Sequence, residues 1–281
     1  MQLWQLAILA IVQGLAELLP VSSSAHVIVA EKLLGLDPTA PQMTLLLVML
    51  HTGTMFAVIA YFWRSWRQAY FSSAAAFRDI AVRIILATAL TGVVGLALQA
   101  FIKHAFMAGA SDFQIENLFG NAKLMAAALA AVGVLILVSL RFQAAGRDAL
   151  SVPQAGWIGV VQGICLPFRG FSRSGATIST GMILGVARRR AEEFSFALAV
   201  VLTPPVIVRE LHRLHKAQAA LGGDAGLGLG HALVPSLIGM GLSFVAGMLA
   251  LRWLSRWLEA GRWHLFGAYC LIASLIVLWV G

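Results

Sequence analysis

Residues 13–26, QGLAELLPVSSSAH, place hydroxyl and ionisable side chains inside an otherwise apolar run. A second stretch, residues 162–177, reads QGICLPFRGFSRSGAT and repeats the pattern. The Gln-Gly pairs lie 149 positions apart and the Ser-x-Ser pairs lie 150 apart: Gln13 and Gln162, Ser22/Ser24 and Ser172/Ser174. An ionisable residue in a membrane segment is costly unless it faces a cavity or a partner. Because the two copies hold opposite charges, Glu17 and Arg173, they predict one site built from both halves of a duplicated protein.

The composition is that of a protein embedded in a membrane. Of the 281 residues, 60% are hydrophobic and 11% are charged, and the mean hydropathy is +0.86. Soluble proteins carry about 25% charged residues, so the sequence predicts an all-α integral membrane protein. The net charge of +8 fits basic loops at a membrane surface, and we expect no nucleic-acid partner.

Six segments are long and apolar enough to cross a bilayer core of about 30 Å: residues 44–63, 84–102, 122–140, 194–211, 231–250 and 264–280. Residues 1–36 and 154–188 differ, because each is broken in the middle, at Pro20 and at Pro167. Each arm has about 15 apolar residues, short of the roughly 20 that a crossing needs. We expect each broken segment to be a re-entrant hairpin, covered by protein or by a cavity.

Each half of the chain then consists of one re-entrant hairpin followed by three transmembrane helices. Residues 1–140 are the predicted first repeat and residues 154–281 the second, within a single membrane domain of residues 1–281. Three crossings is an odd number, so the second repeat must be inverted relative to the first. Inverted repeats with broken helices commonly build a binding site near the middle of the membrane.

The basic residues predict the orientation. One set of loops holds twelve: Arg64, Arg67, Arg78, Arg83, Arg141, Arg147, Arg188, Arg189, Arg190, Arg252, Arg256 and Arg262. The opposite set holds six: Lys32, Lys103, Lys123, Arg209, Arg213 and Lys216. Basic residues collect in cytoplasmic loops, so we expect the first set in the cytoplasm and the mouth of the first hairpin on the outer side. The run Arg188–Arg190, followed by Glu192 and Glu193, is interpreted as a cytoplasmic anchor.

The first polar stretch offers several chemical groups. Gln13 and Glu17 share a helix face; Gln13 suits a hydrogen bond between helices, and Glu17 suits a general acid, a general base or a metal ligand. The three serines Ser22–Ser24 follow the break at Pro20, where a serine often caps a helix. One cap explains one serine but not three followed by His26, which forms a plausible pair with a nucleophilic hydroxyl. His51 is a weaker candidate, because it opens the first full span.

The second polar stretch centres on Arg173. An arginine offers a planar fork of donors that matches phosphate oxygens, and a helix N-terminus flanked by glycine and serine binds anions. We therefore expect Gly170, Ser172, Ser174 and Thr177 to surround an anion, with Thr177 opening the returning helix. The alternative is that Arg173 forms a structural ion pair with Glu17. Arg169 lies closer to the rim.

An arginine, an anion-binding turn, hydroxyls, a histidine and a carboxylate suit hydrolysis of a phosphate or diphosphate carried by a lipid. Electrostatic stabilisation is the main contribution to catalysis of phosphoryl transfer, and a carboxylate can help to hold a divalent cation on a diphosphate.

These two stretches closely resemble those of the undecaprenyl-diphosphate phosphatases of the bacitracin-resistance type, and the resemblance covers essentially the whole chain. It implies dephosphorylation of undecaprenyl diphosphate to the monophosphate at the periplasmic face of the bacterial inner membrane. That reaction recycles the carrier lipid for peptidoglycan synthesis, and bacitracin competes for the same lipid. The resemblance implies Mg²⁺ or Ca²⁺ dependence, with Glu17 as the metal ligand. Its catalytic residues would be Glu17, Ser23, His26 and Arg173, and its substrate-binding residues Gln13, Ser22, Ser24, Gly170, Ser172, Ser174 and Thr177.

Two positions depart from the family pattern. Gln13 stands where many members have glutamate, and Arg169-Gly170 stands where they have Pro-Gly, with Pro167 two residues earlier. The attacking group is left open between the Ser23 hydroxyl, His26 and a water activated by Glu17. A lipid transporter or flippase is the main alternative function, since broken inverted repeats are typical of transporters. An intramembrane serine protease fits less well. The oligomeric state is open, with a homodimer as one alternative.

Overall fold

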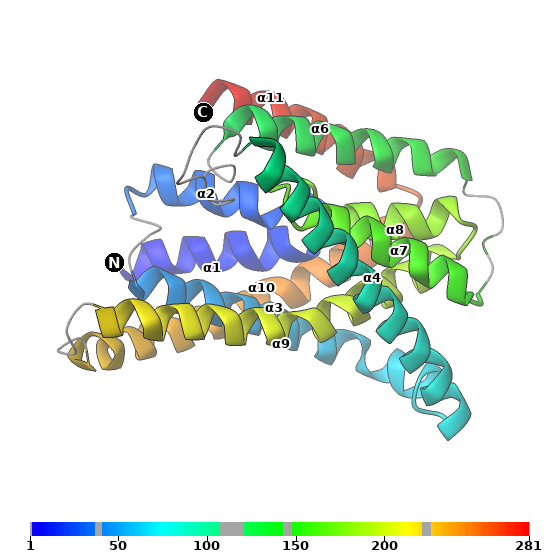
Figure 1. Cartoon of the computed structure of the whole chain (residues 1–281), viewed down its shortest axis with the longest axis horizontal. Helices are drawn as coiled ribbons and strands as arrows, with labels where there is room; N and C mark the ends of the chain where they lie inside the picture. The colour runs from blue at the N-terminus through cyan, green and yellow to red at the C-terminus, as the bar shows by residue number, and fades with distance from the viewer. Residues whose placement is uncertain are drawn as a thin grey trace. The chain divides into compact units, whose positions relative to one another are not determined.

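The computed structural model describes residues 2–36, 41–106, 121–142, 146, 148–220 and 226–280. Helices make up the fold of this part of the chain (Figure 1): α1 (Leu3–Leu18), α2 (Ser23–Leu33), α3 (Pro41–Ala69), α4 (Ala74–Phe106), α6 (Ala122–Ser139), η1 (Leu140–Phe142), α7 (Val152–Cys165), α8 (Arg173–Ile183), α9 (Arg188–Ala220), α10 (Gly226–Glu259) and α11 (Trp263–Val280). The all-α prediction is confirmed. Arg147, one of the predicted cytoplasmic residues, lies outside the described residues, as do the side chains of Arg209, Arg213 and Lys216.

All six predicted spans are helices, and several continue beyond their apolar part. Within the described residues, four helices contain segments long and apolar enough to cross a membrane: Leu45–Ala69, Ala74–His104, Ala122–Phe142 and Leu233–Glu259. The chain is thus a multi-pass membrane protein. The ends of α3 were missed by the prediction because polar residues such as Arg64 and Arg67 interrupt the hydropathy without interrupting the helix.

The helices form two compact units. Unit 1 contains Met1–Leu19, His26–Trp63 and Ala199–Leu254; unit 2 contains Pro20–Ala25, Arg64–Leu198 and Ser255–Gly281. A core of unit 1 joins α1 to α3 through Leu6, Leu9, Ala10, Met43, Leu46 and Leu50. A core of unit 2 joins α4, α7 and α9 through Ile80, Ala87, Ala155, Ile158, Phe194 and Leu198. The helices α3, α9 and α10 each contribute to both units, so the units differ from the two predicted repeats, whose boundaries remain a prediction.

Both broken segments fold as helical hairpins, and the same hydrogen bond closes each one. In α1, Gln5 Nε2 donates to the carbonyl of Leu34 just beyond α2, at 3.2 Å. In α7, Gln154 Nε2 donates to the carbonyl of Leu184 just beyond α8, at 2.8 Å. These glutamines lie 149 positions apart. Each also accepts a backbone hydrogen bond at the start of its own helix, from Gln2 N or from Ser151 N.

The second arm of each hairpin also ends in the same way. Gly35 and Gly185, 150 positions apart, have φ angles of +63° and +79°, in the left-handed region that glycine adopts without a steric penalty. Leu36 N donates to Glu31 O at 3.0 Å, and Val186 N donates to Gly181 O at 2.9 Å. This backbone pattern terminates a helix and satisfies its last carbonyls. The repeated sequence therefore encodes repeated local structure.

Candidate active site

The tip of the first hairpin is a strained turn of hydroxyl residues. Helix α1 ends at Leu18 and α2 begins at Ser23. Between them, Ser22 has a φ of +69°, a conformation that costs a non-glycine residue about 1–3 kcal/mol. Its Oγ lies 3.3 Å from Ser24 Oγ, within hydrogen-bonding distance. The turn therefore holds two hydroxyl groups together at the expense of backbone strain.

The tip of the second hairpin repeats this arrangement with glycine and arginine. Ser172 caps α8 and accepts a hydrogen bond from Gly175 N at 3.3 Å. Ser172 Oγ lies 3.4 Å from Ser174 Oγ, as in the first turn. Gly170 has a φ of +103°, and a Cβ atom there would lie 2.4 Å from the carbonyl oxygen of Met125. Only glycine fits this turn without a shift of the backbone.

The two turns pack against each other within unit 2. A Cβ atom on Gly175 would lie 3.3 Å from Cβ of Pro20, and close to Val132 and Ile136 of α6. The thiol of Cys270 on α11 donates to the carbonyl of Pro20 at 3.2 Å. Helices α6 and α11 lie side by side (Figure 1) and support the first turn. The two turns are therefore neighbours at Gly175 and Pro20, while the single site predicted from both halves stays a prediction.

The residues of the two polar turns differ in how far their side chains are buried. Ser22, Ser172, Ser174 and Thr177 are buried. Ser23, Ser24 and Arg173 are only partly buried, while Arg169 is exposed, as expected for a residue nearer the rim. Ser23, Ser24 and Arg173 are therefore the more exposed residues of the two turns, although the Nη1 atom of Arg173 is itself buried.

Thr177 lies within α8 rather than at its start, because the helix begins four residues earlier, at Arg173. The prediction that Thr177 opens this helix was wrong, since Ser172 provides the cap. The Thr177 hydroxyl donates to the carbonyl of Arg173 at 2.8 Å and lies 2.6 Å from Ser195 Oγ on α9. Its role in substrate binding stays a prediction; in the structure it ties the arginine turn to α9.

The carboxylate of the first stretch lies in unit 1. Gln13 is 1% exposed, and its Nε2 donates to Glu17 Oε2 at 3.2 Å, which confirms that the two share a helix face. His51 Nε2 lies 3.7 Å from the same Glu17 oxygen. The side chain of Glu17 is 17% exposed and that of His51 42%. His26, also in unit 1, is partly buried.

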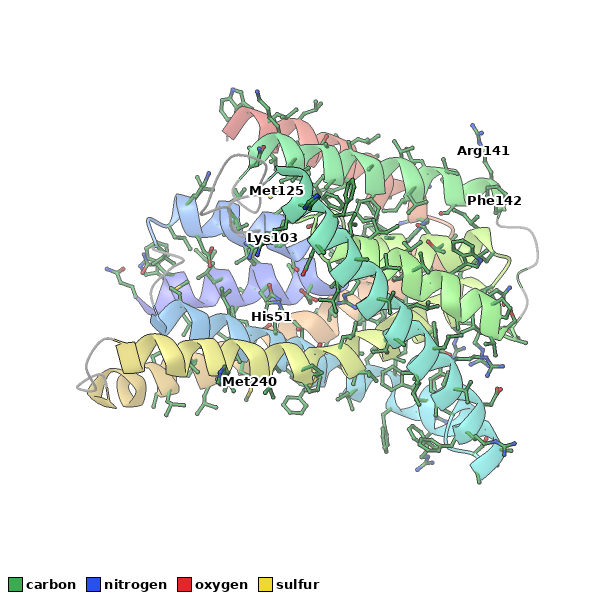
Figure 2. The ribbon with its side chains drawn as sticks, in the orientation of Figure 1. His51, Lys103, Met125, Arg141, Phe142 and Met240 are labelled. Carbon is green, nitrogen blue, oxygen red and sulfur yellow. The ribbon has the colours of Figure 1, made fainter. Side chains whose placement is uncertain are left out.

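His51 is the residue that sequence reasoning undervalued. It does not open a span: α3 begins at Pro41, so His51 lies almost three turns inside the helix (Figure 2). An ionisable side chain so far into an apolar helix was the available signal. The alternative that Arg173 pairs with Glu17 stays a prediction, because the two residues belong to different units.

The donors around Glu17 determine how a divalent cation could be held there. Within the described residues, no group of three or more His, Cys, Asp or Glu side chains could hold a metal ion. Mg²⁺ is commonly held by one or two carboxylates together with waters and substrate phosphates. A single partly exposed carboxylate beside the Gln13 amide fits that arrangement and does not fit an all-protein cage.

The helices and the paired polar turns together define a multi-pass membrane protein with two hydroxyl-rich turns in contact. The chain belongs to the family described as "Bacitracin resistance protein BacA", which matches residues 6–276. It is 63% identical to "Undecaprenyl-diphosphatase 2" of Acinetobacter baylyi over 278 residues, covering 99% of this chain and 98% of that protein. It is 32% identical to a protein of the same name from Burkholderia ambifaria, and 34% identical to "Undecaprenyl-diphosphatase 1" of Burkholderia pseudomallei, each covering 99% of this chain and 96% of the relative.

Proposed function

We propose that this protein is a phosphatase that converts undecaprenyl diphosphate to undecaprenyl phosphate, which recycles the carrier lipid and confers bacitracin resistance. The 63% identity to an undecaprenyl-diphosphatase, over nearly the full length of both chains, supports this function. The structural observation that carries it is the contact of the two polar turns at Pro20 and Gly175. The flippase alternative finds no support among these relatives.

The second turn would bind the diphosphate. Arg173, partly buried at the start of α8, provides a fork of N–H donors for phosphate oxygens. The N-terminus of α8 adds backbone N–H groups and the positive end of the helix dipole. Together they would offset the negative charge that the phosphoryl group carries in the transition state.

The first turn would supply the attacking group. Ser23 is the first residue of α2 and is partly exposed, and His26 follows three residues later, a spacing that puts both on one helix face. Ser23 Oγ would attack the terminal phosphorus as His26 accepts its proton, and the bond from that phosphorus to the bridging oxygen would break, releasing undecaprenyl phosphate. Water would then hydrolyse the phosphoserine, releasing inorganic phosphate and restoring Ser23. Glu17 would assist as a general base for this water.

Glu17 would also hold Mg²⁺ or Ca²⁺ together with the diphosphate oxygens, and the cation would supply positive charge to the leaving phosphate. The Gln13 amide, which donates to Glu17 at 3.2 Å, would orient this carboxylate. The Nε2 atom of His51 lies 3.7 Å from the same Glu17 oxygen. The remaining hydroxyls, those of Ser22, Ser24, Ser172 and Ser174, would position the substrate.

Phosphate release by the purified protein in detergent tests the function directly. We expect release from undecaprenyl diphosphate and its loss on addition of EDTA, with recovery on excess Mg²⁺ or Ca²⁺. Arg173→Lys keeps the charge but loses the fork, and should reduce turnover about 10²–10³-fold. Arg169→Lys, the matched change at an exposed neighbour, should remain near the unmodified rate. No phosphate release under any ionic condition would exclude the proposed function.

An acid-quench experiment with lipid diphosphate labelled in the terminal phosphate identifies the attacking group. We expect labelled phosphate on Ser23 and none in Ser23→Ala. Label on His26 would reverse the two roles. Direct transfer of oxygen from labelled water in one step, with no covalent phosphate in any variant, would assign the attack to water activated by Glu17.

We further propose that the two hairpins are re-entrant, that the repeats are inverted, and that the site faces the periplasm of the bacterial inner membrane. The matched hairpins and the basic loops support this topology. In a background lacking Cys165 and Cys270, cysteines at Ser73 and Gly146 should react only with reagents that reach the cytoplasm. A cysteine at Gly223, which lies outside the described residues, should react from the outside. Labelling of all three from one side would contradict the topology.

A further inference from the structure

A polar cavity of about 250 Å³ lies in unit 2, apart from the residues of both polar turns. It is lined by Ser65, Gln68, Ala69, Asp148, Arg189 and Arg190. Three of these residues form the last turn of α3, whose candidate membrane span ends at Ala69. The cavity therefore lies at the end of a candidate membrane span. None of its residues has a role in the proposed phosphatase chemistry.

The first turn of α9 brings an excess of positive charge to this cavity. Arg188, Arg189 and Arg190 open the helix, at the positive end of its dipole, where cations are unfavourable. Glu193 is fully buried and accepts from Arg189 Nε at 3.1 Å and from Arg190 Nη1 at 2.8 Å. One carboxylate is thus shared by two guanidinium groups. A further negative group beside them would be stabilised.

The neighbouring acid does little to balance this charge. Glu192 is 2% exposed, and Ser255 Oγ donates to it at 2.7 Å. Burial raises the pKa of Glu192 from 4.5 to about 8, so this carboxyl group is largely uncharged at neutral pH. Within the predicted cytoplasmic anchor, both glutamates are thus buried.

The two arginines retain donors for a ligand. A guanidinium carries five N–H donors, and the bonds to Glu193 use one from Arg189 and one from Arg190. The side chains of Arg189 and Arg190 are 68% and 34% exposed, so donors remain accessible at the wall of the cavity. Phosphate oxygens are the acceptors that such forks match best.

Asp148 also lines this cavity and places a negative charge opposite in sign to the two arginines. A free phosphate ion would meet the two arginines but would be repelled by this carboxylate. A phosphate ester with a neighbouring ammonium group would satisfy both. The site also lies beside Phe71 and Phe77 in sequence, two half-exposed rings stacked at 5.7 Å.

We propose that this cavity binds the headgroup of an aminophospholipid such as phosphatidylethanolamine, with the phosphate on Arg189 and Arg190 and the ammonium on Asp148. The ligand class follows from the cavity's two charges and its place at the end of a membrane span. The site is independent of the proposed phosphatase function, and the two can fail separately.

Native mass spectrometry of delipidated protein in detergent, titrated with phosphatidylethanolamine, tests the site. We expect one tightly retained molecule. Arg189→Gln should weaken its binding about tenfold or more, since it removes charge-assisted hydrogen bonds. The matched control is Arg141→Gln, an arginine that projects away from the end of α6 (Figure 2) and should bind as the unmodified protein does. Melting temperatures of all variants establish that they are folded.

Two further measurements distinguish between the possible ligands. Asp148→Asn should remove the preference for phosphatidylethanolamine over phosphatidylglycerol while leaving the phosphate contact. Equal retention of both lipids by the unmodified protein would overturn the assignment of the ammonium to Asp148. Equal binding of phosphatidylethanolamine by Arg189→Gln and Arg141→Gln, or binding of inorganic phosphate that displaces the lipid at equal concentration, would overturn the lipid site.

Discussion

The Nε2 atom of His51 lies 3.7 Å from Oε2 of Glu17, while its Nδ1 atom lies 2.8 Å from the carbonyl oxygen of Leu47, one turn earlier in α3. A proton on Nδ1 donates to this carbonyl, so the Leu47 contact sets which ring nitrogen faces the carboxylate. The Glu17 carboxylate therefore lies between the Gln13 amide, which donates to it, and the oriented imidazole of His51.

This arrangement predicts unequal effects of two substitutions. Glu17→Gln should reduce phosphate release about 10²–10⁴-fold, the usual loss on removing a general acid or base. His51→Gln should reduce it less than about tenfold, because the imidazole only orients the carboxylate across a partly exposed contact. His104→Gln, at an exposed histidine of α4, is the control. If His51→Gln were as inactive as Glu17→Gln, the histidine would itself take part in the reaction.

Ser22 allows its backbone and its hydroxyl to be tested separately. Ser22→Gly relieves the φ of +69°, whereas Ser22→Ala keeps the strain, so the glycine variant should be more stable by about 1 kcal/mol. Both variants lack the Oγ that lies near Ser24, and both should lose phosphate release to the same degree. Full activity of Ser22→Gly would mean that only the shape of the turn matters.

Gly170 and Gly92 form a matched pair of glycines in unit 2. Gly170→Ala would place a Cβ 2.4 Å from the Met125 carbonyl at a φ that disfavours side chains, and should destabilise the protein by at least about 2 kcal/mol. A Cβ on Gly92 in α4 meets nothing within 4 Å, so Gly92→Ala should stabilise by about 0.4–1 kcal/mol. Melting temperatures in detergent should therefore shift in opposite directions.

Glu192 predicts a dependence of stability on pH. Its pKa is raised from 4.5 to about 8 by burial, so the folded state binds more protons than the unfolded state between these values. Its contribution to stability is full below about pH 4.5 and is lost as the pH rises towards 8. Glu192→Gln keeps a hydrogen-bonding oxygen for Ser255 and should flatten the fall in melting temperature over this range. Asp148→Asn, at an exposed acid, should leave the fall unchanged.

The repeated hairpins were predictable because their signals are local. Apolar runs too short to cross a membrane, each broken by proline and serine, allow few other structures. The polar turns were found for the same reason, since hydroxyl and charged residues in such runs are rare.

The remaining contacts could not be predicted because they depend on which helix faces pack together. Nothing in the sequence indicates that Thr177 lies against Ser195, or that α3 presents His51 to Glu17. Gln5 and Gln154 look like ordinary polar residues near helix ends, and only the folded hairpins show that they join both arms. Glu192 and Glu193 follow three arginines in the predicted cytoplasmic anchor, and only tertiary packing shows that both are buried.

The way in which α3, α9 and α10 pass through both units has a consequence for biosynthesis. Unit 1 requires residues up to Leu254 and unit 2 requires residues up to the C-terminal helix. Neither unit is complete while the ribosome is still making the middle of the chain, although domains of many proteins fold one after another during translation. The first helices to be synthesised are therefore inserted into the bilayer before the helices that complete their unit exist. A truncated product would leave both units unfinished rather than yield one intact half.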